Sequence, residues 1–250
     1  MKNLSSKSRN GNDTVPPSGV LDRGLHLMNC FSLERPRLQL RDIAAQSGLD
    51  KATTLRALKT LVTYGYLEKS EDGYYWPGPA TLRLAAIFRS TSNIVTRLER
   101  TVENIALETG QAAAFFIRSG DQRVCLIRDR QKRDFRYFVD VGASVPMSAG
   151  GAAAHVLAAY SGFDLDSEKA EFVLTNNYYI SRGEKNEHLV SAALPIFEAD
   201  GEFVGAAAIT ALRSTVTDDD IDRCIEVVRR EISLAMLSTQ AAAENDNAAF

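Results

Sequence analysis

The sequence predicts an α+β protein of two domains: a winged helix-turn-helix, then a body in which helices pack on an antiparallel sheet. Three observations predict this fold class. A helix–turn–helix pattern occupies residues 40–62, a hairpin pattern follows directly, and the second half mixes strand and helix patterns. The 250 residues are enough for two domains, each with its own hydrophobic core.

The stretch from Leu40 to Lys59 predicts a short helix, a tight turn and a second helix. Gly48 supplies the backbone freedom that the turn requires. Asp50 stands at the N-cap, where its carboxylate can accept the free N–H groups of the second helix. The stretch therefore reads as a helix-turn-helix, although a helical hairpin with a solvated polar face has the same pattern.

Helical spacing divides the second helix into two faces. The side chains expected to face inward are those of Ala52, Leu55, Leu58 and Val62, and those expected to face outward are Thr53, Arg56, Ala57 and Thr60. The outward face is small, hydrogen-bonding and basic, which is what a helix in a DNA major groove requires. The residues expected to contact DNA are Arg41, Lys51, Thr53, Thr54, Arg56 and Thr60.

A β-hairpin is predicted directly after the second helix. Residues 64–69 form a turn and a strand, residues 70–73 form a turn that ends in glycine, and Tyr74 to Trp76 returns as a strand. A helix-turn-helix followed by a hairpin is a winged helix. This context favours DNA binding over a small domain with no nucleic-acid partner.

The charge distribution agrees with a DNA-binding amino-terminal part. Residues 1–78 hold 11 Lys and Arg against 8 Asp and Glu, a net charge of +3 within a chain of net charge −3. A protein that coats DNA with basic charge is excluded by the overall balance. A basic module on an acidic body instead suits a protein in which one part alone meets phosphates.

We expect five segments along the chain: a flexible tail over 1–14, the winged helix over 15–78, a linker helix over 79–92, the body over 93–240 and a second tail over 241–250. Strands are predicted over 112–117, 123–128, 135–141, 189–198 and 202–211. Asp200-Gly201 marks the turn of the last hairpin. An apolar helix is predicted over 151–160, and Thr217 caps a final long helix.

The cysteines and the apolar runs of the sequence indicate the cellular compartment. Three cysteines lie far apart among apolar neighbours, so we expect buried free thiols in a reducing cytoplasm. No apolar run approaches the ~18 residues of a membrane span, and residues 1–13 lack the apolar core of a signal peptide. We expect a cytoplasmic protein with no membrane partner, no cofactor and no metal.

The chain resembles the IclR family of transcriptional regulators. The segments that carry the resemblance lie in the same order as in the family: Val20–Met28, Leu40–Leu61, Tyr64–Glu68, Asp72–Gly78, Val145–Ala152, Tyr179–Arg182, Ser191–Gly201 and Val204–Thr210. The resemblance implies a winged-helix DNA-binding domain, a linker helix and a GAF-like effector-binding domain. It also implies dimers, or dimers of dimers, on near-palindromic operators, with a small organic or aromatic acid as effector.

In relatives the effector lies on the sheet, under the turn that opens the central helix. The resemblance places the effector here against the backbone of Gly151 and Ala152, the hydroxyls of Ser181, Ser191 and Thr210, and the apolar wall of Leu189. A helix amino terminus suits a carboxylate, since its first N–H groups lack partners within the helix. Hydroxyls can donate hydrogen bonds to an anionic or hydroxylated ligand.

Two other functions remain open at this stage. One is a hydrolase on the GAF-like domain that uses Ser191 with His188, although no GxSxG elbow, metal triad or phosphate loop appears. The other is a winged helix that binds a partner protein. Ser181, Ser191 and Thr210 could equally well satisfy sheet edges, and Arg56 could pair with an acid on its own surface.

Overall fold

The computed structural model describes residues 19–129 and 139–240. They divide into two compact units, with the division between Ala86 and Ile87. The strand expected over 135–141 therefore lies mostly outside the described residues, and Val139 to Val141 are not in a strand. Both expected terminal tails, over 1–14 and 241–250, also lie outside the described residues.

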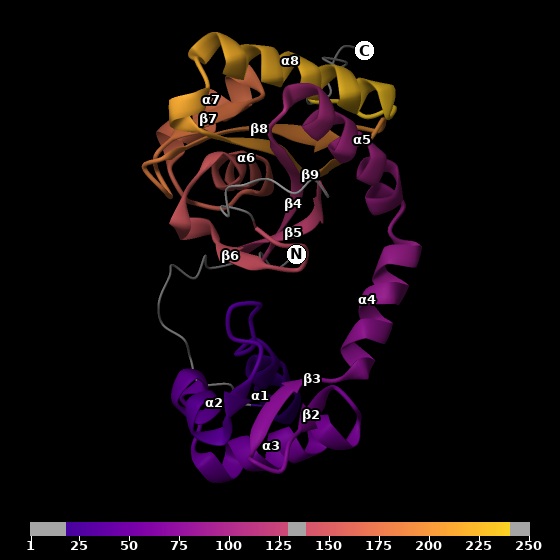
Figure 1. Ribbon diagram of the computed structural model, residues 1–250, viewed down its shortest axis with the longest axis vertical. Coiled ribbons are helices and arrows are strands. Elements are labelled where there is room, and N and C mark those ends of the chain that lie inside the picture. The colour runs from indigo at the N-terminus through magenta and orange to yellow at the C-terminus, as the bar shows by residue number, and fades with distance from the viewer. Residues whose placement is uncertain (1–18, 130–138, 241–250) are drawn as a thin grey trace, which may run out of the picture. The chain divides into compact units, whose positions relative to one another are not determined.

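The first unit is a winged helix, as the sequence predicts (Figure 1). Its elements are α1 (Val20–Met28), β1 (Leu38–Gln39), α2 (Leu40–Ser47), α3 (Lys51–Thr63), β2 (Leu67–Lys69), β3 (Tyr74–Pro77) and the first part of α4 (Pro79–Thr91). The short strand β1, which the sequence patterns do not indicate, pairs with β3 and makes the sheet three-stranded in the order β1-β3-β2.

The predicted turn between α2 and α3 is confirmed. Gly48 ends α2 in the left-handed conformation, with φ of 68°. Asp50 caps α3, and its Oδ1 accepts a hydrogen bond of 2.9 Å from the Thr53 N–H. These two local features fix where one helix stops and the next begins. The core beneath them consists of buried side chains from every element around it: Leu27, Cys30, Leu38, Ile43, Leu58, Leu67 and Tyr75.

The second unit contains the remainder of α4 and a sheet with helices on both faces. Its further elements are α5 (Asn93–Thr109), β4 (Ala112–Ser119), β5 (Gln122–Arg128), β6 (Ser144–Pro146), η1 (Met147–Ala149), α6 (Ala152–Ser161), α7 (Ser167–Asn176), β7 (Tyr179–Arg182), β8 (Leu189–Phe197), β9 (Phe203–Leu212), η2 (Arg213–Thr215) and α8 (Asp218–Leu234). The sheet is antiparallel, in the order β6-β5-β4-β9-β8-β7.

Two hydrophobic cores lie on opposite faces of this sheet because neighbouring side chains along a strand alternate between the faces. Phe115 and Ile209 lie in the core that contains α5 and α8 side chains, whereas Phe116 and Ala208 lie in the core of α6 and α7. In Figure 1, α5 and α8 cover one face and α6 the other. The predicted α+β fold with flanking helices is confirmed.

Besides the short 3-10 turns η1 and η2, the sequence prediction lacks α7 and the two edge strands, β6 and β7. Both strands are short, and the polar, irregular sequences around them carry no clear period of two. The predicted hairpin of β8 and β9 and the Thr217 cap of α8 are confirmed. The domain boundaries assigned from the sequence stay a prediction, since α4 crosses the division between the units.

The cysteines Cys30, Cys125 and Cys224 are buried free thiols, as expected. Burial raises the pKa of the Cys125 thiol to about 12, so this group stays protonated and unreactive near neutral pH. Among the helices of residues 19–129 and 139–240, none is both long enough and apolar enough to cross a membrane.

Candidate functional site

One face of α3 carries the polar residues that the sequence assigns to DNA. Arg56 is exposed, and its Nη2 donates a hydrogen bond of 3.3 Å to the Thr53 hydroxyl. Thr60, one turn further on, is also exposed. No carboxylate within residues 19–129 and 139–240 forms an ion pair with Arg56. The guanidinium is therefore presented beside short hydroxyl side chains, an arrangement that can approach a groove closely.

The expectation that Thr54 faces DNA is wrong. Its side chain is fully buried, and its hydroxyl donates a hydrogen bond of 2.9 Å to the Asp50 carbonyl. This internal bond satisfies the hydroxyl and lets a polar residue enter the core. Thr54, Leu58 and Leu61 form the inward stripe, so α3 is rotated relative to the prediction: Ala52 is exposed, and Ala57 packs against the core.

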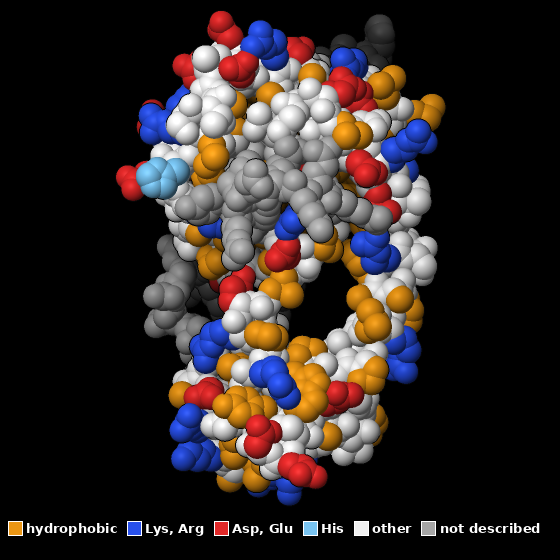
Figure 2. All heavy atoms as spheres, viewed as in Figure 1, with side chains coloured by type: hydrophobic (Ala, Val, Ile, Leu, Met, Phe, Trp, Pro, Cys, Tyr) orange, Lys and Arg blue, Asp and Glu red, His pale blue; other side chains and the backbone are white. Residues whose placement is uncertain are grey.

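The other two basic residues assigned to DNA lie away from the central face of α3. Lys51 is exposed in the first turn of α3. Arg41 lies in the first turn of α2, where its Nε is 3.5 Å from Asp42 Oδ1 and its side chain is 75% exposed. Figure 2 shows Lys and Arg side chains (blue) over the part of the winged helix where α2 and α3 lie.

The wing contributes a cation that the sequence analysis did not single out. The guanidinium of Arg37, just before β1, lies 4.6 Å from the centre of the Trp76 ring on β3. Trp76 Nε1 donates a hydrogen bond of 2.7 Å to Glu68 on β2. The spacing of Arg37 and Trp76, 39 positions apart, carries no sequence signal; only the pairing of β1 with β3 brings them together.

A cavity of about 290 Å³ opens in the second unit, between the sheet and the start of α6. All six residues that the sequence assigns to the effector line it: Gly151, Ala152, Ser181, Leu189, Ser191 and Thr210. Its apolar wall also includes Phe116 and Ala208. A largely apolar cavity with a few polar side chains is the usual form of a small-molecule site.

The three hydroxyl side chains form one row across three strands. Ser181 on β7 pairs directly with Ser191 on β8, and Ser191 pairs with Thr210 on β9. Residues directly opposite each other in antiparallel strands point to the same face. Strand register therefore explains how residues 29 positions apart in the sequence meet along one wall of the cavity.

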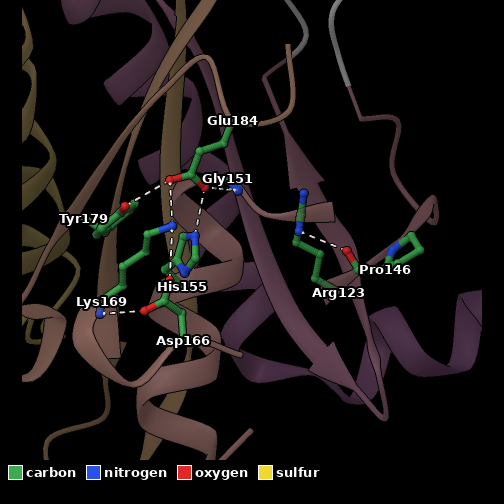
Figure 3. A network of polar contacts seen from close by, with 8 residues as sticks. All are labelled: Arg123, Pro146, Gly151, His155, Asp166, Lys169, Tyr179 and Glu184. Carbon is green, nitrogen blue, oxygen red and sulfur yellow. Dashed lines mark hydrogen bonds and ion pairs between the residues drawn. The ribbon is translucent and has the colours of Figure 1, made fainter. Parts of the chain in front are cut away.

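Glu184, in the loop after β7, forms the densest polar network at this site (Figure 3). Its Oε2 accepts hydrogen bonds from the Gly151 N–H (2.9 Å) and from His155 Nε2 (2.8 Å). Its Oε1 accepts one from the Tyr179 hydroxyl (3.0 Å) and lies 3.4 Å from Lys169 Nζ. The carboxylate thereby joins the loop to α6, α7 and β7.

These partners hold Glu184 in its charged form. Burial by itself would raise its pKa, but hydrogen bonds from Gly151, His155 and Tyr179 outweigh burial and lower the pKa from 4.5 to about 2. An effector carboxylate was expected to accept a hydrogen bond from the Gly151 N–H. In the structure the carboxylate of Glu184 already accepts that hydrogen bond. Neither Glu184 nor His155 was singled out as functional from the sequence.

Arg123 on β5 is a further lining residue that the sequence analysis missed. It is only 4% exposed and lies on the same face of the strand as buried Cys125. An arginine at an inward-facing position of an alternating strand is the signal that could have found it. Burial lowers its pKa to about 10, so the guanidinium remains charged at neutral pH.

The hydrolase alternative finds no support in this geometry. The His188 imidazole is exposed, and its Nε2 lies 3.7 Å from the Glu187 carboxylate. No hydrogen bond joins Ser191 to His188 in the described part of the chain, so this serine lacks the adjacent base that a nucleophile requires. Within the same residues, no group of three His, Cys, Asp or Glu side chains could hold a metal ion.

The IclR helix-turn-helix domain model matches residues 20–71, the segment that folds as α1 to the wing. The HTH-type transcriptional regulator KipR of Bacillus subtilis (strain 168) is 22% identical over 243 residues, covering 88% of this chain and 94% of KipR. Residues 20–71 are thus an IclR-type helix-turn-helix domain, and the chain is similar over most of its length to a transcriptional regulator that contains such a DNA-binding domain.

Solved structures share the fold of this chain. An IclR transcriptional regulator from Alicyclobacillus acidocaldarius superposes with a TM-score of 0.73 at 20% identity, over 89% of this chain and 98% of that one. An IclR homologue from Microbacterium hydrocarbonoxydans, complexed with 4-hydroxybenzoate, gives a TM-score of 0.68 at 16% identity, over 87% of this chain and 99% of that one.

Proposed function

We propose that this IclR-family chain is a ligand-responsive regulator, whose affinity for a near-palindromic operator depends on a small organic or aromatic acid bound in the second unit. In this proposal residues 15–78 bind double-stranded DNA, residues 79–92 form the linker helix, and residues 93–240 bind the effector. The protein acts as a homodimer or a dimer of dimers, because a two-fold protein reads two half-sites.

On the DNA side, the outward face of α3 supports the proposal. Thr53, Arg56 and Thr60 contact the major groove, with Lys51 and Arg41 on flanking phosphates. Thr54 has a different part: it positions α3 from within the core. Arg56 is the residue best placed to reach a base edge, because it is exposed and forms no ion pair with a carboxylate among residues 19–129 and 139–240.

On the effector side, one observation carries the proposal: six residues assigned from the sequence line one cavity of about 290 Å³. A volume of this size suits a compact molecule, at the small end of ligand cavities in proteins. The Microbacterium homologue, which binds 4-hydroxybenzoate, supports an aromatic acid as one candidate class. Ser181, Ser191 and Thr210 offer hydrogen bonds to such a ligand.

Exposed apolar side chains support self-association. On α1, Val20 is 84% and Leu21 75% exposed, and Leu25 extends the same apolar character. On α4, Leu82 is 72% exposed. Clustered apolar side chains on helices are uncommon at free surfaces and mark interaction sites, so a second copy of this chain is the proposed partner.

Binding of the effector can regulate DNA binding because the two binding equilibria are thermodynamically linked. An effector that binds one conformational state more tightly than another shifts the population toward the first, by no more than its differential affinity. If the two states differ in operator affinity, occupancy of the cavity changes transcription. A winged helix that binds a partner protein is the competing function, and it differs from DNA binding in its response to salt.

The first test is a gel shift with the purified protein and the DNA upstream of its own gene, at two salt concentrations. We expect a specific shift that weakens steeply at the higher salt, because phosphate contacts release counterions. A gel shift that depends on neither DNA sequence nor salt would favour the competing function. So would the absence of any gel shift from a protein that still binds a partner protein.

Arg56→Ala extends this test to one residue. We expect operator affinity to fall by about tenfold or more, the cost of one lost arginine–base contact, with thermal stability unchanged. Arg83→Ala on α4 is the matched control, since it removes the same charge from an exposed position outside the helix-turn-helix. Equal operator affinity for the two variants would show that α3 is not the recognition helix.

A further inference from the structure

Arg123 has an unusual environment for a buried charge. Its side chain lies inside the second unit with 4% exposure, and its single hydrogen bond in the described part of the chain runs from Nη1 to the Pro146 carbonyl at 3.4 Å. No carboxylate within residues 19–129 and 139–240 forms an ion pair with it. A guanidinium has five N–H donors, and a buried charge without a counter-ion is costly. Among residues 19–129 and 139–240, the guanidinium is therefore a buried cation without an anionic partner.

The guanidinium lies at the cavity. It lines the same space as the hydroxyl row, and Nη2 is 3.9 Å from the point where a Cβ on Gly151 would lie. The first turn of α6 is thus beside it. The N–H groups of Ala152 and Ala153, which also line the cavity, have no hydrogen-bond partner among the described residues.

Glu184 divides this region into two sides. Its carboxylate accepts the Gly151 N–H and occupies the side of the turn toward His155, whereas Arg123 lies apart from this network (Figure 3). An incoming anion would meet the fixed negative charge of Glu184 on the first side. On the second side it would meet the buried guanidinium and the N–H groups of Ala152 and Ala153, which have no anionic partner in the described part of the chain.

We infer that Arg123 binds the carboxylate of the effector. The apolar body of the molecule then lies against Phe116 and Ala208, and its far end reaches the hydroxyls of Ser191 and Thr210. The ligand class is a compact monocarboxylate that carries a hydrogen-bonding group, such as a hydroxyl, away from its carboxylate. This inference rests on the proposed function, and it adds the residue that selects the charge.

The test is isothermal titration calorimetry of the full chain with three carboxylates and their uncharged amides. The probes are lactate, benzoate and 4-hydroxybenzoate against lactamide, benzamide and 4-hydroxybenzamide. For at least one pair we expect the carboxylate to bind about ten- to one-hundredfold more tightly than the amide, as hydrogen bonds to a charged acceptor imply. In Arg123→Met this preference falls to about threefold or less.

Two further variants keep the result interpretable. Arg123→Lys retains the charge but lacks the planar guanidinium, so it should keep part of the preference for carboxylate over amide. This variant also provides a test if Arg123→Met fails to fold. Lys185→Met is the matched control, because Lys185 also lines the cavity but is exposed. We expect it to retain the full preference for carboxylate.

The outcomes distinguish a failure of the role assigned to Arg123 from a failure of the proposed function. A preference for carboxylate that survives in Arg123→Met, or that is lost in Lys185→Met instead, overturns the inference about Arg123 and leaves the proposed function standing. If none of the six probes binds the wild-type chain, the organic-acid effector itself fails, and the role of Arg123 fails with it.

Discussion

Thr54 and Arg56 lie two positions apart on α3 and have opposite surroundings. The Thr54 hydroxyl is buried against the Asp50 carbonyl, while the Arg56 guanidinium is exposed beside Thr53. A rotation of 200° between residues i and i+2 of a helix accounts for the difference. Thr54 therefore has a place in the core, and Arg56 is the residue of the two that we propose to contact DNA.

Thr54→Val tests this separation. Valine keeps the shape and loses the hydroxyl, and the Asp50 carbonyl still accepts the backbone N–H of residue 54 at 2.9 Å. We expect the free energy of unfolding to fall by about 0.5–1.5 kcal/mol, the worth of one hydrogen bond, with operator affinity unchanged. Urea unfolding and a gel shift measure the two quantities. Weaker operator binding at unchanged stability would return Thr54 to the DNA face.

At the scale of elements, one carboxylate joins three parts of the second unit. Glu184 accepts hydrogen bonds from α6 through Gly151 and His155 and from β7 through Tyr179, and its Oε1 lies 3.4 Å from Lys169 of α7. Glu184 and Gly151 both line the cavity, so the loop that bears Glu184 contributes to the shape of the site as well as to stability.

Glu184→Gln should lower the free energy of unfolding at pH 7 by about 1–3 kcal/mol, because charge-assisted hydrogen bonds are replaced by neutral ones. The wild-type contribution is fully present above pH 4.5, the ordinary carboxyl pKa, and is lost as the pH falls toward the folded-state pKa of about 2. The difference between the two proteins should vanish over this window.

Thermal unfolding between pH 7 and pH 2 measures this difference. Glu187→Gln is the matched control in the same loop, since its side chain is 85% exposed and should contribute little. If Glu184→Gln and Glu187→Gln had the same stability at pH 7, the network around Glu184 would not hold the loop in solution.

At the scale of the whole molecule, two units divide the labour. The winged helix carries the cationic face, and the cavity lies entirely in the second unit. If the two proposed functions are correct, single substitutions can alter DNA binding and effector binding separately. Coupling between them is a free energy that a mutation can change without changing either fold.

Ser191→Val tests the coupling. Ser191 is the middle member of the hydroxyl row, so its loss should weaken a bound ligand by about 1 kcal/mol or more and shift the effector dose response to higher concentration. Operator affinity of the free protein should not change. Gel shifts over a titration of a carboxylate that binds the wild-type chain measure both. An unaltered dose response would place the effector elsewhere.

Local sequence determined the winged helix, the cap of α3 at Asp50 and the β8–β9 hairpin. These features could be predicted because turns, caps and periodicity act over a few neighbouring residues. Tertiary structure decided the rest. It rotated α3 so that Thr54 is buried, and it brought Arg123, Glu184 and the three hydroxyls to one cavity from four strands and a loop. Contacts between residues that are distant in the sequence depend on strand register, and register is set by tertiary packing rather than by neighbouring residues.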